Sequence, residues 1–452
     1  MSQLFGTDGV RGKAGEFPLD IATIRRLGAA LVRALHHDGP LQAENSDVIR
    51  CLAGRDTRES GRWIERELAF GMRSQGGRFT SAGVVPTPAI AYLTPRMGYS
   101  FGVVISASHN PFEDNGIKVF SGAGEKFTEA VERQVESIMA DTSWSVPGGD
   151  APAVEEVDLR SEYLDHLRDI LPAAYRKPGM RVAIDCANGA TTTVAPRLFR
   201  ELGFDVSCIG VAPDGRNINL GSGSTAPDAL ARLVVEEQHA AGIAFDGDGD
   251  RAIFVDASGR IVDGDAVMLM CAKQLKSEGR LQGDAIVATV MSNIGLEIAL
   301  RDAAIGMFRC AVGDKYVMEE MIRRDLSLGG EQSGHIIFSE YLFTGDGLAT
   351  ALNVLRTMSA SRRELGDLAS ELTTYPQVLL NVRVRQKVDL NTVPEITAAI
   401  AAVESRLAGN GRLLVRYSGT EPLLRVMLEG QDQGAIRQWG QEIIDAVKQH
   451  IA

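Results

Sequence analysis

The chain has 452 residues, which at ~150 residues per domain predicts three or four domains. Hydrophobic residues make up 44% and charged residues 23%, which excludes a disordered or fibrous chain and indicates a globular protein with a buried core. The net charge of −12 disfavours nucleic acid as a partner, so an anionic ligand must meet local cations. No apolar run approaches the ~20 residues of a membrane span, and scattered cysteines without C-x-x-C spacing indicate free thiols in a reducing, cytoplasmic compartment.

Apolar segments of strand length alternate with amphipathic segments of helix length over the first three quarters of the chain. The first unit contains predicted strands at 48–53 and 101–106, a helix over about 64–72, and an exit strand at 117–120. The same plan returns twice, with predicted strands at 182–185, 206–209, 242–245 and 252–255, and then at 284–289, 307–310 and 336–338. Alternation of this kind predicts mostly parallel sheets with helices on both faces.

Each of these three units delivers one polar, glycine-rich loop just before a short apolar exit strand. Loops at the carboxyl ends of strands are where such sheets bind ligands. The pattern fits three diverged repeats, and it also fits three unrelated α/β domains in series.

The last ~80 residues follow a different pattern, with closely spaced strands at 378–384, 413–417 and 423–428 and two amphipathic helices. The predicted fold class is therefore α/β, with three similar mixed or parallel α/β domains and a smaller C-terminal α+β domain around a central cleft. The predicted domains are 1–150, with a phosphoserine loop; 151–256, with a metal loop; 257–369, with a sugar loop; and 370–452, with a phosphate loop.

The strongest local signal is the loop that carries Asp246, Asp248 and Asp250, separated by glycines. Three carboxylates at alternate positions can converge on one hard cation, which offsets their mutual repulsion. An EF-hand is excluded, because its sixth and twelfth positions require Gly and Glu where this chain has Arg251 and Ala257. The short loop favours Mg²⁺, and a solvated Asp-Gly turn is the alternative.

Two serines, Ser106 and Ser108, follow an apolar strand. Either is a candidate nucleophile or phosphoryl carrier, and either can instead form a local side-chain turn. His109 is a candidate base or a hydrogen-bonded loop residue. Lys118, flanked by Ile117 and Val119, is a candidate acid or base, with a lysine reaching out to solvent as the alternative.

The segment 416–422 predicts a phosphate site, because its hydroxyls and backbone N–H groups are flanked by Arg416 and Arg425. A plain hairpin turn is the alternative, and the Walker lysine of a nucleotide loop is lacking. Glu331 and Ser333 suit sugar hydroxyls or a helix cap. Arg11, in a glycine-rich turn, is either a phosphate contact or part of a hairpin at the start of the chain.

Four motifs carry a family resemblance: Ser-Ala-Ser-His-Asn-Pro, Asp-Gly-Asp-Gly-Asp-Arg, Gly-Glu-Gln-Ser-Gly-His and Arg-Tyr-Ser-Gly-Thr-Glu-Pro. In this order they resemble the four signature loops of the α-D-phosphohexomutases. Phe-Gly-Thr-Asp-Gly-Val-Arg-Gly at 5–12 and Gln332 look like the bacterial branch that acts on glucosamine phosphates. One departure is Tyr417, which stands where many relatives have lysine.

The resemblance implies an enzyme that isomerises glucosamine 6-phosphate to glucosamine 1-phosphate, with a phosphoryl group on Ser108 and a sugar 1,6-bisphosphate as intermediate and primer. The implied Mg²⁺ ligands are Ser108, Asp246, Asp248 and Asp250, and the implied catalytic residues are Ser108, Lys118, His109, His335, Arg251 and Arg11. The implied substrate contacts are Glu331, Ser333, Arg416, Ser418, Gly419, Thr420 and Arg425. A homodimer without nucleic-acid or membrane partners is expected. The alternatives are phosphomannomutase/phosphoglucomutase activity and a sugar-phosphate or metal sensor.

Overall fold

The computed structural model describes residues 4–6, 8–36, 48–418 and 422–451. The chain forms two compact units: unit one comprises residues 1–291 and 308–370, and unit two comprises residues 292–307 and 371–452. None of the described helices has both the length and the apolar character needed to cross a bilayer.

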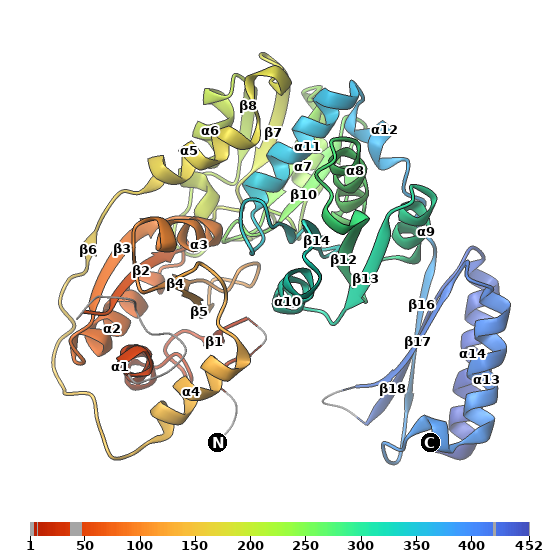
Figure 1. The fold of residues 1–452 in the computed structure, drawn as a ribbon, viewed down its shortest axis with the longest axis horizontal. Coiled ribbons are helices and arrows are strands. Elements are labelled where there is room, and N and C mark those ends of the chain that lie inside the picture. Colours follow the sequence, from red (N-terminus) through yellow and green to blue (C-terminus); the bar gives the residue numbers. More distant parts are fainter. Residues whose placement is uncertain (1–3, 7, 37–47, 419–421, 452) are drawn as a thin grey trace. The chain divides into compact units, whose positions relative to one another are not determined.

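The first sheet of unit one has the strand order β1-β5-β4-β2-β3-β6 (Figure 1). Its strands are β1 (Val10–Lys13), β2 (Arg50–Arg55), β3 (Arg78–Val84), β4 (Phe101–Ile105), β5 (Asp114–Ser121) and β6 (Glu155–Glu156). Strands β4, β2, β3 and β6 are parallel, whereas β5 runs antiparallel to β4. Strand β1 pairs antiparallel with β5, so Arg11 lies on a sheet edge and not in a hairpin of the first residues.

Side-chain alternation divides this first sheet into two faces. Helices α1 (Ile21–His36), α2 (Gly61–Arg73) and α4 (Glu129–Ala140) contribute to one hydrophobic core with Phe101, Ile117 and Val119. Helix α3 (Thr87–Arg96) lies against the opposite face, where a Cβ on Gly54 or Gly102 would meet Ile90. Because successive strand residues point to opposite faces, Lys118 points away from the core of Ile117 and Val119.

Two further α/β sheets complete unit one (Figure 1). The second has the order β11-β10-β9-β7-β8, with β7 (Arg181–Asp185), β8 (Asp205–Ile209), β9 (Ala241–Phe245), β10 (Ala252–Asp256) and β11 (Ile261–Val262). The third has the order β13-β12-β14-β15, with β12 (Ala285–Thr289), β13 (Gly306–Cys310), β14 (Leu328–Gly330) and β15 (Ile336–Phe338). The helices of this part are α5 (Arg160–Ile170), α6 (Ala195–Glu201), α7 (Asp228–Glu236), α8 (Gly264–Ser277), α10 (Asp314–Arg324), α11 (Gly347–Ser361) and α12 (Leu365–Ala369).

The three polar loops of unit one have the same structural context. Each links a strand to an antiparallel neighbour: β4 to β5, β9 to β10 and β14 to β15. The loops are too short for the dozen or so residues that a parallel crossover needs, so each exit strand turns back as a hairpin. The α/β class is confirmed, and the exit strands make all three sheets mixed.

Unit two contains the small three-stranded antiparallel sheet β16-β18-β17, with β16 (Gln377–Arg383), β17 (Arg412–Tyr417) and β18 (Leu423–Glu429). Helices α13 (Pro394–Leu407) and α14 (Gln433–His450) pack on it around Ile396, Val403 and Ile443. Helix α9 (Ile294–Asp302) also belongs to this unit: the N–H of Ile294 donates to Glu429 Oε2 at 3.1 Å. The predicted smaller C-terminal α+β domain is thus present.

Candidate active site

The loop between β4 and β5 gives its two serines different partners. Ser106 Oγ donates to Asp56 Oδ2 at 2.6 Å and accepts from the N–H of Ser108 at 2.9 Å. Ser108 has a left-handed backbone with a φ of 52°, and its Oγ donates to Asp246 Oδ2 at 2.5 Å. Ser106 therefore supports the turn, and Ser108 is the hydroxyl that reaches the aspartate loop.

Arg58 supports the backbone of this loop, a role that the sequence analysis did not assign to it. Its guanidinium donates to the carbonyl oxygens of Ser108 at 2.9 Å, Asn110 at 2.8 Å and Asp114 at 2.9 Å. Its Nε also donates to Asp56 Oδ2 at 2.8 Å. Since Asp56 and Arg58 are both buried, they form a rigid support for Ser108.

The loop between β9 and β10 gathers three buried carboxylates. Asp246, Asp248 and Asp250 each offer an oxygen, and these oxygens lie within 4.8 Å of one another. Oδ1 of Asp248 and Oδ1 of Asp250 are buried without a hydrogen-bond partner among the described residues. Burial, together with the charges of Asp250 and Asp248, raises the pKa of Asp246 well above its usual range. Carboxylate oxygens without hydrogen-bond partners are suitable ligands for a divalent cation such as Mg²⁺, and a cation would also offset the repulsion among the three carboxylates.

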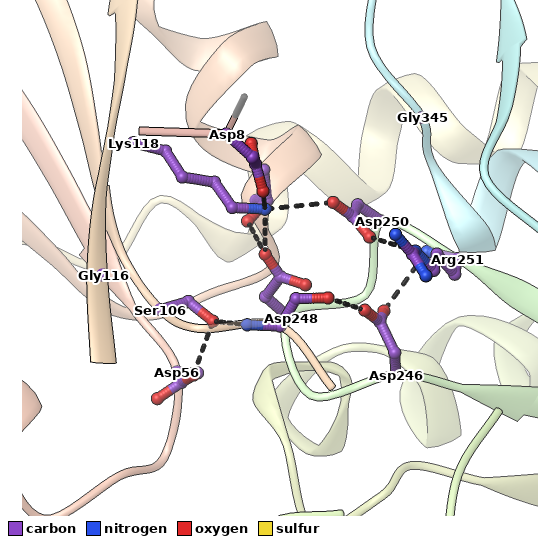
Figure 2. Close-up of polar contacts among 12 residues, drawn as sticks. Asp8, Asp56, Ser106, Gly116, Lys118, Asp246, Asp248, Asp250, Arg251 and Gly345 are labelled. Carbon is purple, nitrogen blue, oxygen red and sulfur yellow. Dashed lines mark hydrogen bonds and ion pairs between the residues drawn. The ribbon is translucent and has the colours of Figure 1, made fainter. Parts of the chain in front are cut away.

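The ammonium of Lys118 lies among three carboxylates (Figure 2). Its Nζ is 2.9 Å from Asp248 Oδ2, 3.1 Å from Asp250 Oδ2 and 3.1 Å from Asp8 Oδ2. The side chain is 2% exposed, so the alternative of a lysine reaching out to solvent is wrong. Burial alone would lower its pKa, but the attraction of Asp248, Asp250 and Asp8 outweighs burial and raises the pKa well above the usual value.

Asp8 extends these ion pairs toward the third sheet. Lys126 Nζ donates to Asp8 Oδ1 at 2.5 Å and also contacts Asp314 Oδ2. Asp314 Oδ2 lies 3.6 Å from His335 Nε2, and His335 Nδ1 lies 3.7 Å from Asp250 Oδ2. Sequence reasoning did not assign Asp8, Lys126 or Asp314, although Asp8 lies in the segment 5–12 used for the family resemblance.

A cavity of about 390 Å³ lies beside these charges in unit one. It is lined by Leu4, Gly6, Asp8, Gly9, Arg11, His109, Asp250, Arg251, Val312, Gly313, Asp314 and Glu331. Glu331 Oε1 accepts from the N–H of Gly313 at 3.0 Å, and Ser333 Oγ donates to Glu331 Oε2 at 3.3 Å. The lining carries two arginines, which can contact a phosphate, and four carboxylates, which can accept hydrogen bonds from hydroxyl groups, so the cavity suits a ligand with both kinds of group.

The two histidines named from the sequence differ in environment. His109 lines the cavity, and its Nδ1 is 3.3 Å from Ser108 Oγ. Burial and the nearby charges of Arg251 and Arg11 lower the pKa of His109, which favours a neutral ring that can accept a proton. His335 is 1% exposed, and its Nε2 accepts from the N–H of Gly345 at 3.0 Å.

Unit two carries the predicted phosphate loop. Arg416 and Arg425 are direct cross-strand partners on β17 and β18, and Arg425 Nη2 is 3.5 Å from Ser418 Oγ. Lys387 Nζ donates to the carbonyl oxygen of Ser418 at 2.6 Å, so a lysine approaches the loop from a part of the chain that sequence reasoning did not select. Gly419 and Thr420 lie outside the described residues.

Tyr417 has a structural role at the base of this loop. Its hydroxyl donates to the carbonyl oxygen of Val388 at 2.9 Å. The residue that departs from the lysine of many relatives therefore ties β17 to the segment that carries Lys387.

Domain models of one family match the chain four times in succession. They are described as phosphoglucomutase/phosphomannomutase, with alpha/beta/alpha domain I at residues 2–145, domain II at 161–259, domain III at 263–375 and the C-terminal domain at 379–446.

Similar proteins cover almost the whole chain. A phosphoglucosamine mutase of Solibacter usitatus is 47% identical over 99% of this chain and 99% of its own length. A phosphoglucosamine mutase of Syntrophotalea carbinolica is 45% identical over 99% of this chain and 98% of its own length. Among solved structures, a phosphoglucomutase/phosphomannomutase family protein of Burkholderia thailandensis has a TM-score of 0.79 at 21% identity, covering 99% of this chain and 98% of that chain. That structure is similar in fold.

Proposed function

Because the chain belongs to the phosphoglucomutase/phosphomannomutase family, we propose that it is a phosphoglucosamine mutase that interconverts glucosamine 6-phosphate and glucosamine 1-phosphate. Glucosamine phosphate is supported as the substrate because two relatives, 45% and 47% identical over nearly the full length, are named phosphoglucosamine mutase. An Aspergillus fumigatus N-acetylphosphoglucosamine mutase was solved with GlcNAc-6P and magnesium; its TM-score is 0.60 at 18% identity, over 89% of this chain and 83% of that chain.

The observation that carries the proposal is the contact between Ser108 and the aspartate loop. The buried Ser108 hydroxyl lies 2.5 Å from Asp246 Oδ2. Beside it are two carboxylate oxygens, of Asp248 and Asp250, that have no hydrogen-bond partner among the described residues. A phosphorylated serine and a divalent cation would fit together in this arrangement. The proposed metal ligands are Ser108, Asp246, Asp248 and Asp250. A bound Mg²⁺ would draw electron density from the transferring phosphoryl group.

In the proposed reaction, Ser108 gives and retakes one phosphoryl group. O1 of glucosamine 6-phosphate attacks the phosphorus on Ser108 Oγ; the bond to Oγ breaks and a bond to O1 forms, which yields the 1,6-bisphosphate. After the sugar reverses its orientation, Ser108 Oγ attacks the phosphorus on O6 and glucosamine 1-phosphate is left. The same bisphosphate, supplied from outside, would prime an unphosphorylated enzyme.

Fixed charges and one proton acceptor support these steps. Arg251 and Arg11 line the cavity, and with the ammonium of Lys118 they supply positive charge near the transferring group, which is most of what phosphoryl transfer requires. His109 is close enough to Ser108 Oγ to carry the proton that O1 loses. Lys118 is held as a cation, and His335 accepts a hydrogen bond from Gly345, so both suit a supporting role better.

The remaining proposed roles concern recognition. Glu331 and Ser333 would bind sugar hydroxyls, and Arg416, Ser418, Gly419, Thr420 and Arg425 would hold the phosphate that is not transferred. The domains 1–150, 151–256, 257–369 and 370–452, a cytoplasmic location and a homodimer remain predictions from the sequence.

An assay with glucosamine 6-phosphate against glucose and mannose phosphates tests this function, together with peptide mass spectrometry of Ser108. We expect the largest kcat/KM for glucosamine 6-phosphate and a phosphoryl group on Ser108. A preference for mannose or glucose phosphates would replace the proposal by phosphomannomutase/phosphoglucomutase activity. Binding without turnover would indicate a sensor, and phosphate found only on Ser106 would overturn the role of Ser108.

A further inference from the structure

The backbone that presents Ser108 is held by a side chain from the second α/β sheet. Asn219 lies in the connection between β8 and α7, and its Nδ2 donates to the carbonyl oxygens of Ser108 at 2.8 Å and Asn110 at 3.1 Å. Arg58 Nη2 donates to the same two carbonyls at 2.9 and 2.8 Å. Each carbonyl therefore accepts one hydrogen bond from each side of the boundary between the first and second sheets.

We propose that Asn219 is a positioning residue that fixes Ser108 Oγ opposite the aspartate loop during phosphoryl transfer. This inference rests on the function proposed above. Ser108 has a φ of 52°, a left-handed conformation that costs an L-residue free energy and persists only where surrounding contacts hold it. Arg58 anchors the loop only to its own sheet, whereas Asn219 connects it to the part of the molecule that carries Asp246.

The packing around Asn219 connects it directly to the aspartate loop. A Cβ on Gly247 would lie 2.5 Å from the carbonyl oxygen of Ser108 and 2.9 Å from Asn219 Nδ2. The amide of Asn219, the Ser108 carbonyl and the backbone of Gly247 are thus in close contact. The N–H of Asn219 also donates to the carbonyl oxygen of Ala187 at 2.9 Å, which fixes the position of the residue itself. A shift of this amide would change the separation between Ser108 Oγ and Asp246.

The same boundary offers a matched control. Arg216 Nε donates to Glu59 Oε2 at 2.8 Å, and both side chains are largely exposed. This ion pair bridges the same two parts of unit one, but among the described residues Glu59 makes no hydrogen bond to the backbone of 106–111. Glu59→Gln therefore weakens the boundary without removing a hydrogen bond to the Ser108 loop.

The test uses the full chain with Asn219→Asp, Asn219→Gly and Glu59→Gln. Asn219 has a φ of 58°, which Asp tolerates and Gly adopts freely, so both replacements remove the amide donor without imposing backbone strain. Gly adds no charge, which separates loss of the donor from the electrostatic effect of Asp. We expect kcat for glucosamine 6-phosphate to fall roughly tenfold to a hundredfold in both Asn219 variants, with KM changed much less. Amide hydrogen exchange in the peptide 106–111 should be faster, and Glu59→Gln should match the wild type in both measurements.

Wild-type kcat in either Asn219 variant, or an equal loss in Glu59→Gln, would overturn the proposal. A loss confined to Asn219→Asp would also overturn it, because the added charge would then be the cause. If the wild-type protein does not turn over glucosamine 6-phosphate, the proposed function fails. Hydrogen exchange still tests the inference in that case: unchanged exchange in the Asn219 variants contradicts it, and faster exchange limited to 106–111 supports it.

Discussion

Asp8, Asp248 and Asp250 share the buried ammonium of Lys118, so we expect this side chain to influence both stability and the affinity of the proposed metal site. Removing one partner of a buried ion cluster typically costs about 3–5 kcal/mol, because the remaining charges stay desolvated. Lys118→Met should therefore lower the free energy of unfolding by about this amount in metal-free buffer. Added Mg²⁺ should restore more stability in the variant than in the wild type, because it replaces part of the lost positive charge.

Urea denaturation with and without Mg²⁺ measures both effects. Lys13→Met is the control, since Lys13 is 59% exposed and pairs with Glu16 at the surface. An equal Mg²⁺ shift in the wild type and in Lys118→Met would contradict the coupling of Lys118 to the proposed metal site, and no shift in either protein would contradict the site itself.

Asp346 couples stability to pH through a different buried contact. It begins helix α11, where its Oδ1 accepts from the N–H of Ala349 at 2.9 Å and its Oδ2 from the hydroxyl of Tyr163 at 2.8 Å. Burial, only partly opposed by these hydrogen bonds, raises its pKa to about 6. An unfolded Asp has a pKa of ~3.9. Between this pH and about pH 6, the folded chain therefore holds more protons than the unfolded chain. The contribution of Asp346 to the free energy of unfolding consequently falls as the pH rises through this range.

Asp346→Asn should remove this pH dependence. The pKa difference of about two units corresponds to roughly 3 kcal/mol. Between pH 4 and 6 the wild type should lose about this much free energy of unfolding relative to the variant. Above pH 6 the difference between the two proteins should stay constant. Urea denaturation across pH 4 to 8 gives the two curves. Parallel curves would show that the Asp346 carboxyl titrates normally in the fold.

At the scale of elements, the hairpin of β17 and β18 places Arg416 directly opposite Arg425. Like charges at directly opposed positions destabilise a sheet by about 0.2–1 kcal/mol, so the pair is better explained by anion binding than by stability. Arg416→Thr should leave the stability of unit two equal or higher by that amount, since Thr also favours strands. Substrate binding should weaken, and kcat/KM should fall roughly tenfold to a hundredfold if one charged hydrogen bond is lost.

Steady-state kinetics and thermal unfolding separate the two effects. Arg383→Thr makes the same change at an exposed position of β16, opposite Leu423, and should change neither KM nor kcat. If Arg416→Thr lowers stability and leaves KM unchanged, the two arginines are not a phosphate site.

Over the whole molecule, the sequence predicted local chemistry better than long-range contacts. The aspartate loop and the antiparallel C-terminal sheet were predicted because spacing and alternation within a few residues determine them. The mixed or parallel sheets are confirmed, and the structure adds that each exit strand is the antiparallel member of its sheet, which follows from loops too short for a parallel crossover. The supporting roles of Arg58 and Asn219, and the ion pairs of Asp8 with two lysines, depend on partners distant in the chain or carried by another sheet. No local pattern marks such pairs.

The contact between Glu429 and helix α9 has a consequence for recombining parts of this protein with relatives. Glu429 is fully buried and accepts from the N–H of Ile294, while Asn293 Oδ1 accepts from the N–H of Tyr375 at 2.9 Å. A Cβ on Gly295 would lie 1.9 Å from the carbonyl oxygen of Thr373, so the two segments fit only with glycine at that position. The C-terminal part therefore cannot be exchanged with that of a relative by a single recombination point near residue 370. A functional chimaera would need two exchanged segments, because residues 292–307 must come from the same parent as residues 371–452.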